Sequence, residues 1–172
     1  IFDFGGGSSS NNLFLGRETV WNNLVLRGFS GSAVSGAVTA VNALAGQVGN
    51  WIHVAATVDS GNVARLYVNG AEAGSVTLSG ALNYSAWTQN FIGASNWVGD
   101  RQFRGAMDDI AIFDRALTAG EVATMASTAT APTVVLKSIA ENSANGTNVF
   151  EARSRDVDAG DGITYSILSG NT

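Results

Sequence analysis

The sequence predicts an all-β protein built as a two-sheet antiparallel sandwich. Its 172 residues are 45% hydrophobic and include 21 glycines but one proline, a composition typical of many short strands joined by glycine turns. Between residues 51 and 69, apolar side chains occupy every second position in two successive runs, which is the period of strands with two unlike faces. Such strands need a second sheet to cover their apolar face.

The central prediction is a three-stranded meander. One strand is expected over residues 51–59, with Ser60-Gly61-Asn62 turning the chain into a second strand over residues 63–69. Asn69-Gly70 is a two-residue hairpin signal, since both residues tolerate positive φ. A third antiparallel strand should therefore follow residue 70.

Further strands are expected on both sides of this meander. Residues 37–41 could form an edge strand, and residues 41–44 could equally form a short turn of helix. In residues 103–114, the alternation predicts one long strand with Asp109 on one face and Asp108 on the other, beside Ile110 and Ile112. The remaining expected strands are short and cover residues 2–4, 13–16, 24–28 and 91–93.

A short helix is expected to close this first domain. Thr118 and Glu121 have the spacing of a capping box, in which each side chain satisfies a backbone N–H of the first helical turn. Small residues follow at 127–133, which we interpret as a linker.

Several separated motifs make residues 1–126 resemble the laminin-G-like, concanavalin A-like domains of bacterial surface proteins. The resemblance implies a jelly-roll sandwich whose opening strands are missing here, as in a piece cut from a longer protein. The motifs are Trp51-x-His53-Val54-Ala55, Leu66-Tyr67-Val68-Asn69-Gly70, Ile92-Gly93, Phe103-x-Gly105-x-x-Asp108-Asp109 and Arg115-Ala116-Leu117-Thr118-x-x-Glu121.

Residues 134–172 resemble the opening of a cadherin-like repeat, a partial second β-sandwich domain. The resemblance implies calcium binding by Glu141, Asp156, Asp158 and Asp161. Oxygen ligands around a glycine turn suit calcium, but the preceding linker lacks the acidic residues that such repeats share with the ion. The alternative is a solvated acidic turn.

Asp108 and Asp109 are the second candidate metal ligands. As neighbours in a strand they point to opposite faces, so they cannot flank one glycosidic bond. The resemblance implies that an aspartate at position 108 helps to hold calcium. The alternative is a buried acid held by backbone amides or an arginine.

His53 is the only histidine, and the chain has no cysteine. A zinc site or catalytic triad therefore lacks partners, and a structural role is expected for His53. These observations predict that the protein is not an enzyme.

Two polar loops carry the candidate ligand-binding residues. Sugars are recognised by an aromatic ring stacked on their C–H face, with amide, carboxylate and guanidinium groups holding the hydroxyls. The alternative role for the tryptophans is to plug the ends of the core, above all for Trp21 and Trp51. The candidates are Tyr84, Trp87, Asn96, Trp97, Asp100 and Arg101.

The expected function is a non-enzymatic extracellular recognition or adhesion module that binds a glycan or a partner protein, within a large modular surface protein. A net charge of −5 argues against a nucleic-acid partner, and no apolar run reaches the ~18 residues of a membrane span. The alternatives are a passive spacer stiffened by calcium and, less favoured, a glycoside hydrolase or its accessory domain.

Overall fold

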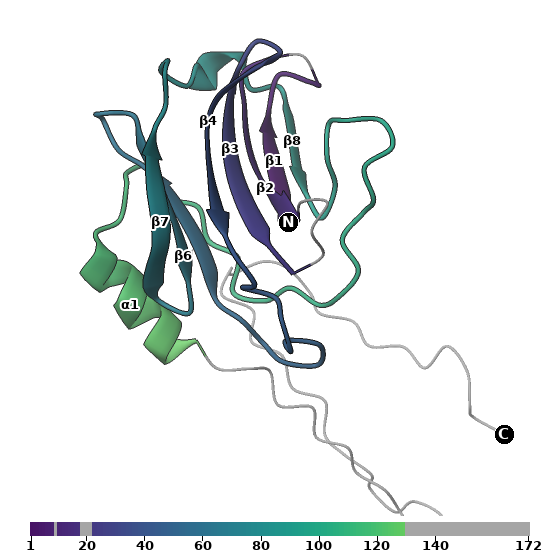
Figure 1. The fold of residues 1–172 in the computed structure, drawn as a ribbon. Coiled ribbons are helices and arrows are strands. Elements are labelled where there is room, and N and C mark those ends of the chain that lie inside the picture. The colour runs from purple at the N-terminus through teal and green to yellow at the C-terminus, as the bar shows by residue number, and fades with distance from the viewer. Residues whose placement is uncertain (9, 18–21, 130–172) are drawn as a thin grey trace, which may run out of the picture. The chain divides into compact units, whose positions relative to one another are not determined.

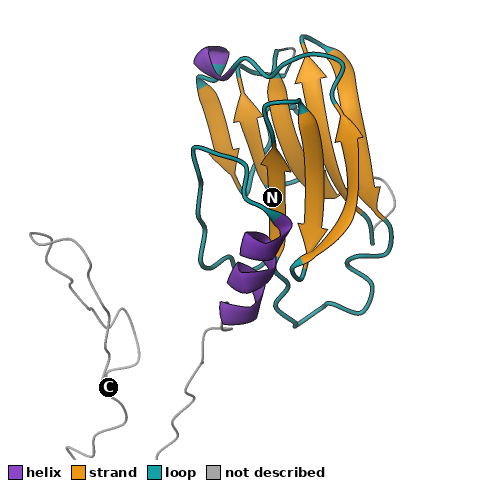
Figure 2. Ribbon diagram, turned by 90° about the vertical axis from the view of Figure 1, so that its left-hand side faces the viewer, coloured by secondary structure: helices purple, strands orange, loops and turns teal. Residues whose placement is uncertain are grey.

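The computed structural model describes residues 1–8, 10–17 and 22–129 as two antiparallel sheets and one α-helix (Figures 1 and 2). The chain divides into two units, residues 1–132 and 133–172. The predicted sandwich is confirmed for the first unit. The predicted cadherin-like domain and most of the predicted linker lie outside the described residues, as does Trp21.

The larger sheet has five strands in the order β4-β3-β2-β1-β8, and the smaller has three in the order β5-β6-β7. The strands of the larger sheet are β1 (Phe2–Gly5), β2 (Asn12–Arg17), β3 (Leu24–Ser30), β4 (Ala33–Ala40) and β8 (Gln89–Ile92). The strands of the smaller sheet are β5 (Val54–Val58), β6 (Val63–Val68) and β7 (Ala71–Thr77). Residues 37–40 therefore belong to a strand, and residues 41–44 form a turn that follows it.

The core lies between the facing sides of the two sheets. The alternation predicted for the meander is confirmed, because every second residue of β5 and β6 packs inward. The buried side chains of this core are Leu13, Leu15, Leu24, Leu26, Val38, Ala40, Ala64, Leu66, Leu78 and Leu82.

Both predicted turns of the meander form as expected. The carboxylate of Asp59 accepts hydrogen bonds from the backbone N–H groups of Gly61 (2.9 Å) and Val63 (3.0 Å), which holds the first turn. Asn69 and Gly70 have φ of 51° and 81°, the left-handed values that a tight hairpin requires. Local hydrogen bonds and backbone freedom therefore set the register of these strands.

Helix α1 (Ala119–Thr128) begins at the predicted capping box. Thr118 accepts a hydrogen bond from the Glu121 N–H, and the Glu121 carboxylate accepts one from the Thr118 N–H. Arg115 also donates twice to Glu121, at 2.6 and 2.9 Å. The Arg115 and Thr118 hydrogen bonds lower the pKa of Glu121 to about 2.

The strand predicted over residues 103–114 is wrong, because this segment runs as irregular chain. Ile110 and Ile112 are exposed instead of buried. Asp109 has φ of 50°, a left-handed value that interrupts an extended backbone. The alternation of this segment is therefore not matched by pairing to a neighbouring strand in the described part of the chain.

Candidate functional site

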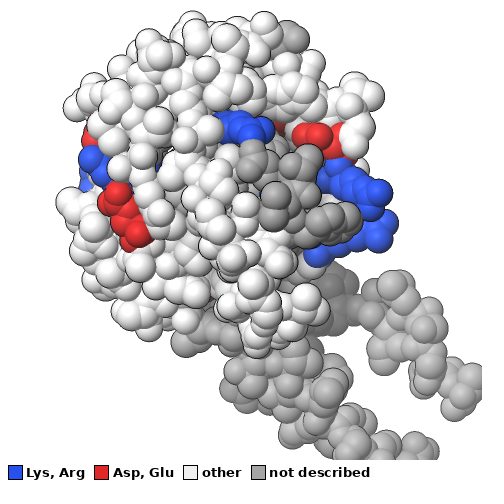
Figure 3. All heavy atoms as spheres, in the orientation of Figure 1, with Lys and Arg blue, Asp and Glu red and all other residues white. Residues whose placement is uncertain are grey.

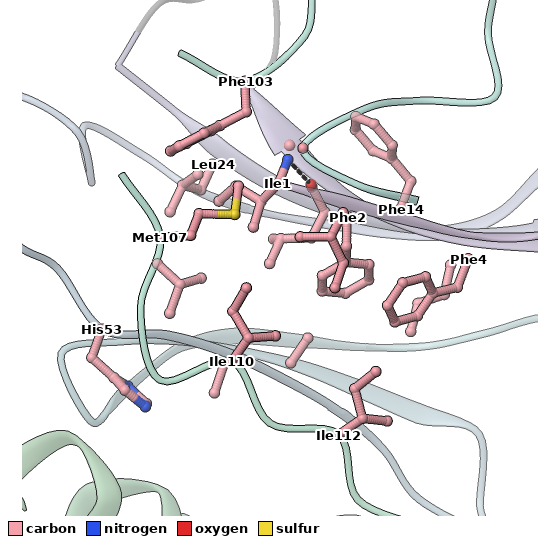
Figure 4. A pocket seen from close by; sticks show the side chains of 18 of the residues that line it. Ile1, Phe2, Phe4, Phe14, Leu24, His53, Phe103, Met107, Ile110 and Ile112 are labelled. Atoms are coloured by element: carbon pink, nitrogen blue, oxygen red, sulfur yellow. Dashed lines mark hydrogen bonds between the residues drawn. The ribbon is translucent and has the colours of Figure 1, made fainter. Parts of the chain in front are cut away.

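A large, open and mostly apolar pocket runs along strands β1 and β5, and its lining includes residues from both sides of the larger sheet, such as Phe2 and Phe14. Its volume is about 2530 Å³, and segment 103–114 crosses it. Figure 4 shows Phe2 and Phe4 facing Ile110 and Ile112 across this space, with Phe14 on the opposite side of the larger sheet.

The first group of predicted ligand residues lies at the rim of this cavity. The rings of Tyr84 and Trp87 meet edge to face with centroids 4.8 Å apart, and Trp87 lies 6.4 Å from Phe4. Trp87 packs partly against the core, and its buried indole N–H has no hydrogen-bond partner. Tyr84 is exposed. Trp87 therefore serves packing at least in part, as the alternative interpretation proposed.

The second group lies on the outer face of the larger sheet. Loop 94–102 folds over this face and places Trp97 against two phenylalanines, with ring centroids 4.7 Å from Phe29 and 6.2 Å from Phe14. Asn96 and Trp97 are half-buried, whereas Asp100 and Arg101 are exposed. Asp100 and Arg101 also contribute to the cavity lining, so they stand where the loop turns from the outer face toward the cavity.

The structure thus separates residues that the sequence had grouped as one set of ligand contacts. Phe2 and Phe4 point inward from β1, so Tyr84 and Trp87 belong to the inner side of the larger sheet. Asp3 lies between them and points outward, toward the loop that carries Trp97.

Asp3 holds loop 94–102 in place. Its side chain is completely buried and accepts hydrogen bonds from Asn12 Nδ2 at 2.8 Å, the Asn96 backbone N–H at 2.6 Å and Ser95 Oγ at 3.3 Å. Ser95 Oγ also donates to Asp100 at 2.8 Å. We call Asp3, Asn12, Ser95, Asn96 and Asp100 the Asp3 cluster.

The missing side chain of Gly5 on β1 leaves space for the Asn12 side chain of β2, which belongs to this cluster. A Cβ on Gly5 would lie 2.2 Å from Asn12 Cγ, so the absence of a side chain on β1 lets the Asn12 amide lie flat over the sheet. From there its Nδ2 reaches Asp3. Gly5 does not have a positive φ, so glycine is required here by the close contact with Asn12 and not by the backbone conformation.

Sequence reasoning missed Asp3, Asn12 and Ser95 as members of the site. One signal was present, since an aspartate that alternates with Phe2 and Phe4 must point away from the core. Nothing local indicated that residues 95 and 96 would cover it.

The predicted metal ligands are not brought together among the described residues. Asp108 is exposed, so its expected burial is wrong, although its carboxylate does accept a hydrogen bond from a backbone amide, the Asp109 N–H, at 3.0 Å. Asp109 is exposed beside it. Glu141, Asp156, Asp158 and Asp161 lie outside the described residues. Within the described ranges, no three His, Asp or Glu side chains gather closely enough to hold a metal ion.

His53 and Trp51 lie beside the meander. His53 and Asn69 bridge the strands, since the His53 N–H donates to Asn69 Oδ1 at 3.0 Å and its carbonyl accepts from the Asn69 N–H at 2.8 Å. Burial lowers the pKa of His53. Trp51 is 43% exposed, so it does not plug the core.

Charged groups are sparse on the face shown in Figure 3, where most of the visible surface is uncharged. Only 13% of the residues are charged. Among the described helices, none has both the length and the apolar character needed to cross a bilayer.

Comparison with known proteins places this chain in a family. Residues 1–123 match the sequence model of a protein family described as the concanavalin A-like lectin/glucanases superfamily (Laminin_G_3). The chain belongs to this laminin-G-like family, which confirms the resemblance seen in its motifs.

One solved structure is similar to this chain, the 2.1 Å crystal structure of an S-layer domain-containing protein (residues 221–444) from Clostridium thermocellum ATCC 27405. The two are 30% identical, with a TM-score of 0.42, and the match covers 73% of this chain. The chain spans 61% of the length of that structure. No curated protein matches the chain.

Proposed function

We propose that this domain is a non-enzymatic, extracellular recognition module that binds a glycan on the outer face of its five-stranded sheet. The observation that carries the proposal is the position of Trp97. Loop 94–102 holds this ring beside Phe14 and Phe29, and the same loop carries the exposed side chains of Asp100 and Arg101.

The chemistry of this surface suits a pyranose ring. The half-exposed aromatic rings offer an apolar face for the C–H side of a sugar. The negative face of the ring attracts the weakly positive C–H groups, as it attracts the ring edge of another aromatic side chain. Asp100 accepts hydrogen bonds from sugar hydroxyls, and Arg101 donates to them. Asp100 is tied to the tryptophan, because its backbone N–H donates to the Trp97 carbonyl at 3.2 Å, and Arg101 follows it directly in the chain.

Anchoring of the loop supports a binding role. Three hydrogen bonds from Asn12, Ser95 and Asn96 converge on the buried Asp3, and the Trp97 N–H donates to Ser95 Oγ at 3.1 Å. A preformed site loses less conformational entropy on binding. Membership of a lectin-like superfamily is consistent with a glycan ligand and with a place at the cell surface.

A glycan array with the full chain, followed by calorimetry on the hits, tests the proposal. Arg101→Ala removes an exposed side chain, so it should leave the melting temperature unchanged. Loss of a hydrogen bond to a charged group should weaken glycan binding about 10- to 100-fold. Trp97→Phe should weaken binding through the smaller ring.

Tyr84→Ala is the matched control, because Tyr84 is an exposed aromatic residue on the other side of the sheet. It should leave the affinity unchanged. Silence of the array at high protein concentration would overturn the proposal, as would binding that depends on Tyr84 but not on Arg101. Capture of a purified surface protein without any glycan dependence would favour a protein ligand instead.

A further inference from the structure

Strand β5 forms a free edge of the smaller sheet. In the described part of the chain its only strand neighbour is β6, and every residue from 51 to 60 lines the large pocket. Segment 103–114 lies across this pocket, but no backbone hydrogen bond among the described residues joins it to β5. The backbone groups on the far side of β5 therefore face the pocket.

The hydrogen bonds to β6 show which backbone groups of β5 point to this free edge. At one end of β5, His53 accepts a hydrogen bond from the Asn69 N–H at 2.8 Å. At the other end, the Asp59 N–H donates to the Val63 carbonyl at 3.1 Å. Residues bonded to one neighbour alternate along an antiparallel strand, so the odd-numbered residues of β5 also face β6. The residues whose N–H and C=O groups point away from the sheet are Val54, Ala56 and Val58.

The other three edge strands of the two sheets are β4, β7 and β8, and each has a feature that hinders further pairing. Proteins protect such edges with bulges, charged side chains, proline or a covering segment. The register shifts where β4 pairs with β3 and where β7 pairs with β6. Beside β8, the returning chain donates the Phe103 N–H to the Gly93 carbonyl at 2.7 Å. β5 pairs with β6 without a register shift and contains only Val, Ala and Thr, so it has neither a bulge nor a charge.

We propose that two copies of this chain pair through their β5 strands, antiparallel and about a two-fold axis at Ala56. The two smaller sheets then form one continuous sheet. Ala56 of each copy exchanges N–H and C=O hydrogen bonds with Ala56 of the other, and Val54 meets Val58 in the same way. Every outward-pointing backbone group of β5 thereby gains a partner.

The side chains that meet in this register are compatible. A two-fold axis brings the same surface of both copies together, so each contact occurs twice. On the inner face, valine meets valine and alanine meets alanine. On the outer face, Ala55 lies opposite Thr57, which is a pair without charge.

The charges at the two ends of β5 favour a second copy as the partner and fix the register. His53 of one copy lies opposite Asp59 of the other, and these are the only titratable side chains in residues 51–60. His53 Nδ1 is buried without a hydrogen-bond partner, and a basic ring opposite a carboxylate stabilises a strand pair. A shift of the register by two residues separates His53 from Asp59 at both ends.

This association goes beyond the proposed function and does not depend on glycan binding. Sedimentation equilibrium of the full chain tests it from about 5 µM to about 1 mM, because a single strand pair makes a small interface of modest affinity. A reversible monomer–dimer equilibrium is expected. Ala56→Pro should weaken the dimer by about tenfold or more, since it removes the N–H at the two-fold axis and leaves the bonds from β5 to β6 intact.

His53→Asp and His53→Asn form a matched pair that tests the charge contact. Both keep the backbone N–H that donates to Asn69, but only His53→Asp places a carboxylate opposite Asp59 of the second copy. His53→Asp should therefore dimerise more weakly than His53→Asn by about threefold or more. Urea unfolding checks that each variant keeps its fold.

Cysteine cross-linking tests the register directly, because the chain has no cysteine of its own. Directly opposed residues outside the hydrogen-bonded pairs have Cα atoms about 4.5 Å apart, within reach of a disulfide. Ala55→Cys/Thr57→Cys should therefore form a covalent dimer with the thiol oxidant diamide. Ala55→Cys alone should not, because its counterpart lies on the longer diagonal.

The proposal is overturned if the full chain stays a monomer over the whole concentration series, or if folded Ala56→Pro dimerises like the wild type. Equal dimerisation of His53→Asp and His53→Asn, or no cross-link in the folded double-cysteine variant, would also contradict it. Loss of the dimer in Ile112→Ser, but not in Ala56→Pro, would assign the association to the exposed apolar side chains of segment 103–114 instead.

Discussion

Removing the carboxylate of Asp3 should be among the most damaging changes on the outer face of the sheet. Asp3→Ala leaves the Asn12 amide and the Asn96 N–H without their acceptor, whereas Ser95 still donates to Asp100. Each buried donor left unpaired costs about 1–3 kcal/mol, so the two together predict a loss of about 2–6 kcal/mol in the free energy of unfolding. Relief from burying a charge works in the opposite direction, but it does not supply the missing acceptor.

Asp3→Asn should cost much less, because the site can repair itself. The new amide places a nitrogen toward either Asn12 or Asn96. If it faces Asn12, that side chain can turn its amide by 180° and present its Oδ1, which has no hydrogen-bond partner. One neutral hydrogen bond then replaces one to a charged group, and the expected loss is about 1–2 kcal/mol.

Urea unfolding followed by tryptophan fluorescence measures both values from the midpoint and slope. Asn12→Leu, which removes the amide but keeps a similar volume, is a useful comparison at the same contact. Equal losses for Asp3→Ala and Asp3→Asn would refute this reasoning, as would a loss below about 0.5 kcal/mol for Asp3→Ala, the range of ordinary surface substitutions.

Three further predictions concern the frame that carries the site. Glu121→Gln should reduce the loss of stability at low pH. Folding lowers the pKa of this carboxylate from 4.5 to about 2, so the carboxylate stabilises the folded state fully above pH 4.5 and loses that effect as the pH falls through 2. Melting temperatures between pH 2 and 6 measure the effect, and a pH profile identical to that of the wild type would contradict it. Gly70→Ala should lower the free energy of unfolding by more than about 1 kcal/mol, because φ is 81° and the new Cβ would lie 3.0 Å from the Ala126 side chain of α1. Gly31→Ala is the control for backbone strain alone, since φ is 62° there and no atom lies within 4 Å of the new Cβ. Equal losses of stability in the two variants would exclude a contribution from the helix contact. Leu66→Ala, at a site with 0% exposure, should cost about 2–5 kcal/mol in urea unfolding, and a loss under 1 kcal/mol would show that the core does not lie between the sheets as described.

The meander and the closing helix could be predicted because their signals are local. Alternation over five or six residues identifies the buried face, and turn and cap residues act within four positions of one another, as at Asn69-Gly70 and Thr118–Glu121. These elements form where predicted, and the register between β5 and β6 follows from the turn that joins them.

Segment 103–114 shows the limit of that reasoning. Alternation states which side chains could share a face, but a strand also needs a neighbour with free backbone groups in the right register. That condition depends on residues far away in the chain. Nothing in the sequence around Asp109 indicates that this residue adopts a positive φ and not the extended conformation of a strand residue.

The candidate site was predicted in part. Asn96, Trp97, Asp100 and Arg101 were identified from their composition, and they do lie in one loop. The surface on which that loop rests could not be predicted, because the contact between Asp3 and Asn96 joins residues that lie 93 positions apart in the chain. The separation of Trp97 from Trp87 has the same cause, since sequence distance does not reveal which side of a sheet a loop will cover.

Indole N–H resonances in a ¹H–¹⁵N spectrum test the central claim most directly. The full chain is titrated with a glycan selected on the array, and the resonances of Trp97 and Trp87 are assigned from Trp→Phe variants. The outer-face site predicts that the glycan shifts the Trp97 indole signal and leaves the Trp87 signal in place. A shift of Trp87 with Trp97 unchanged would move the site to the cavity rim and contradict the account.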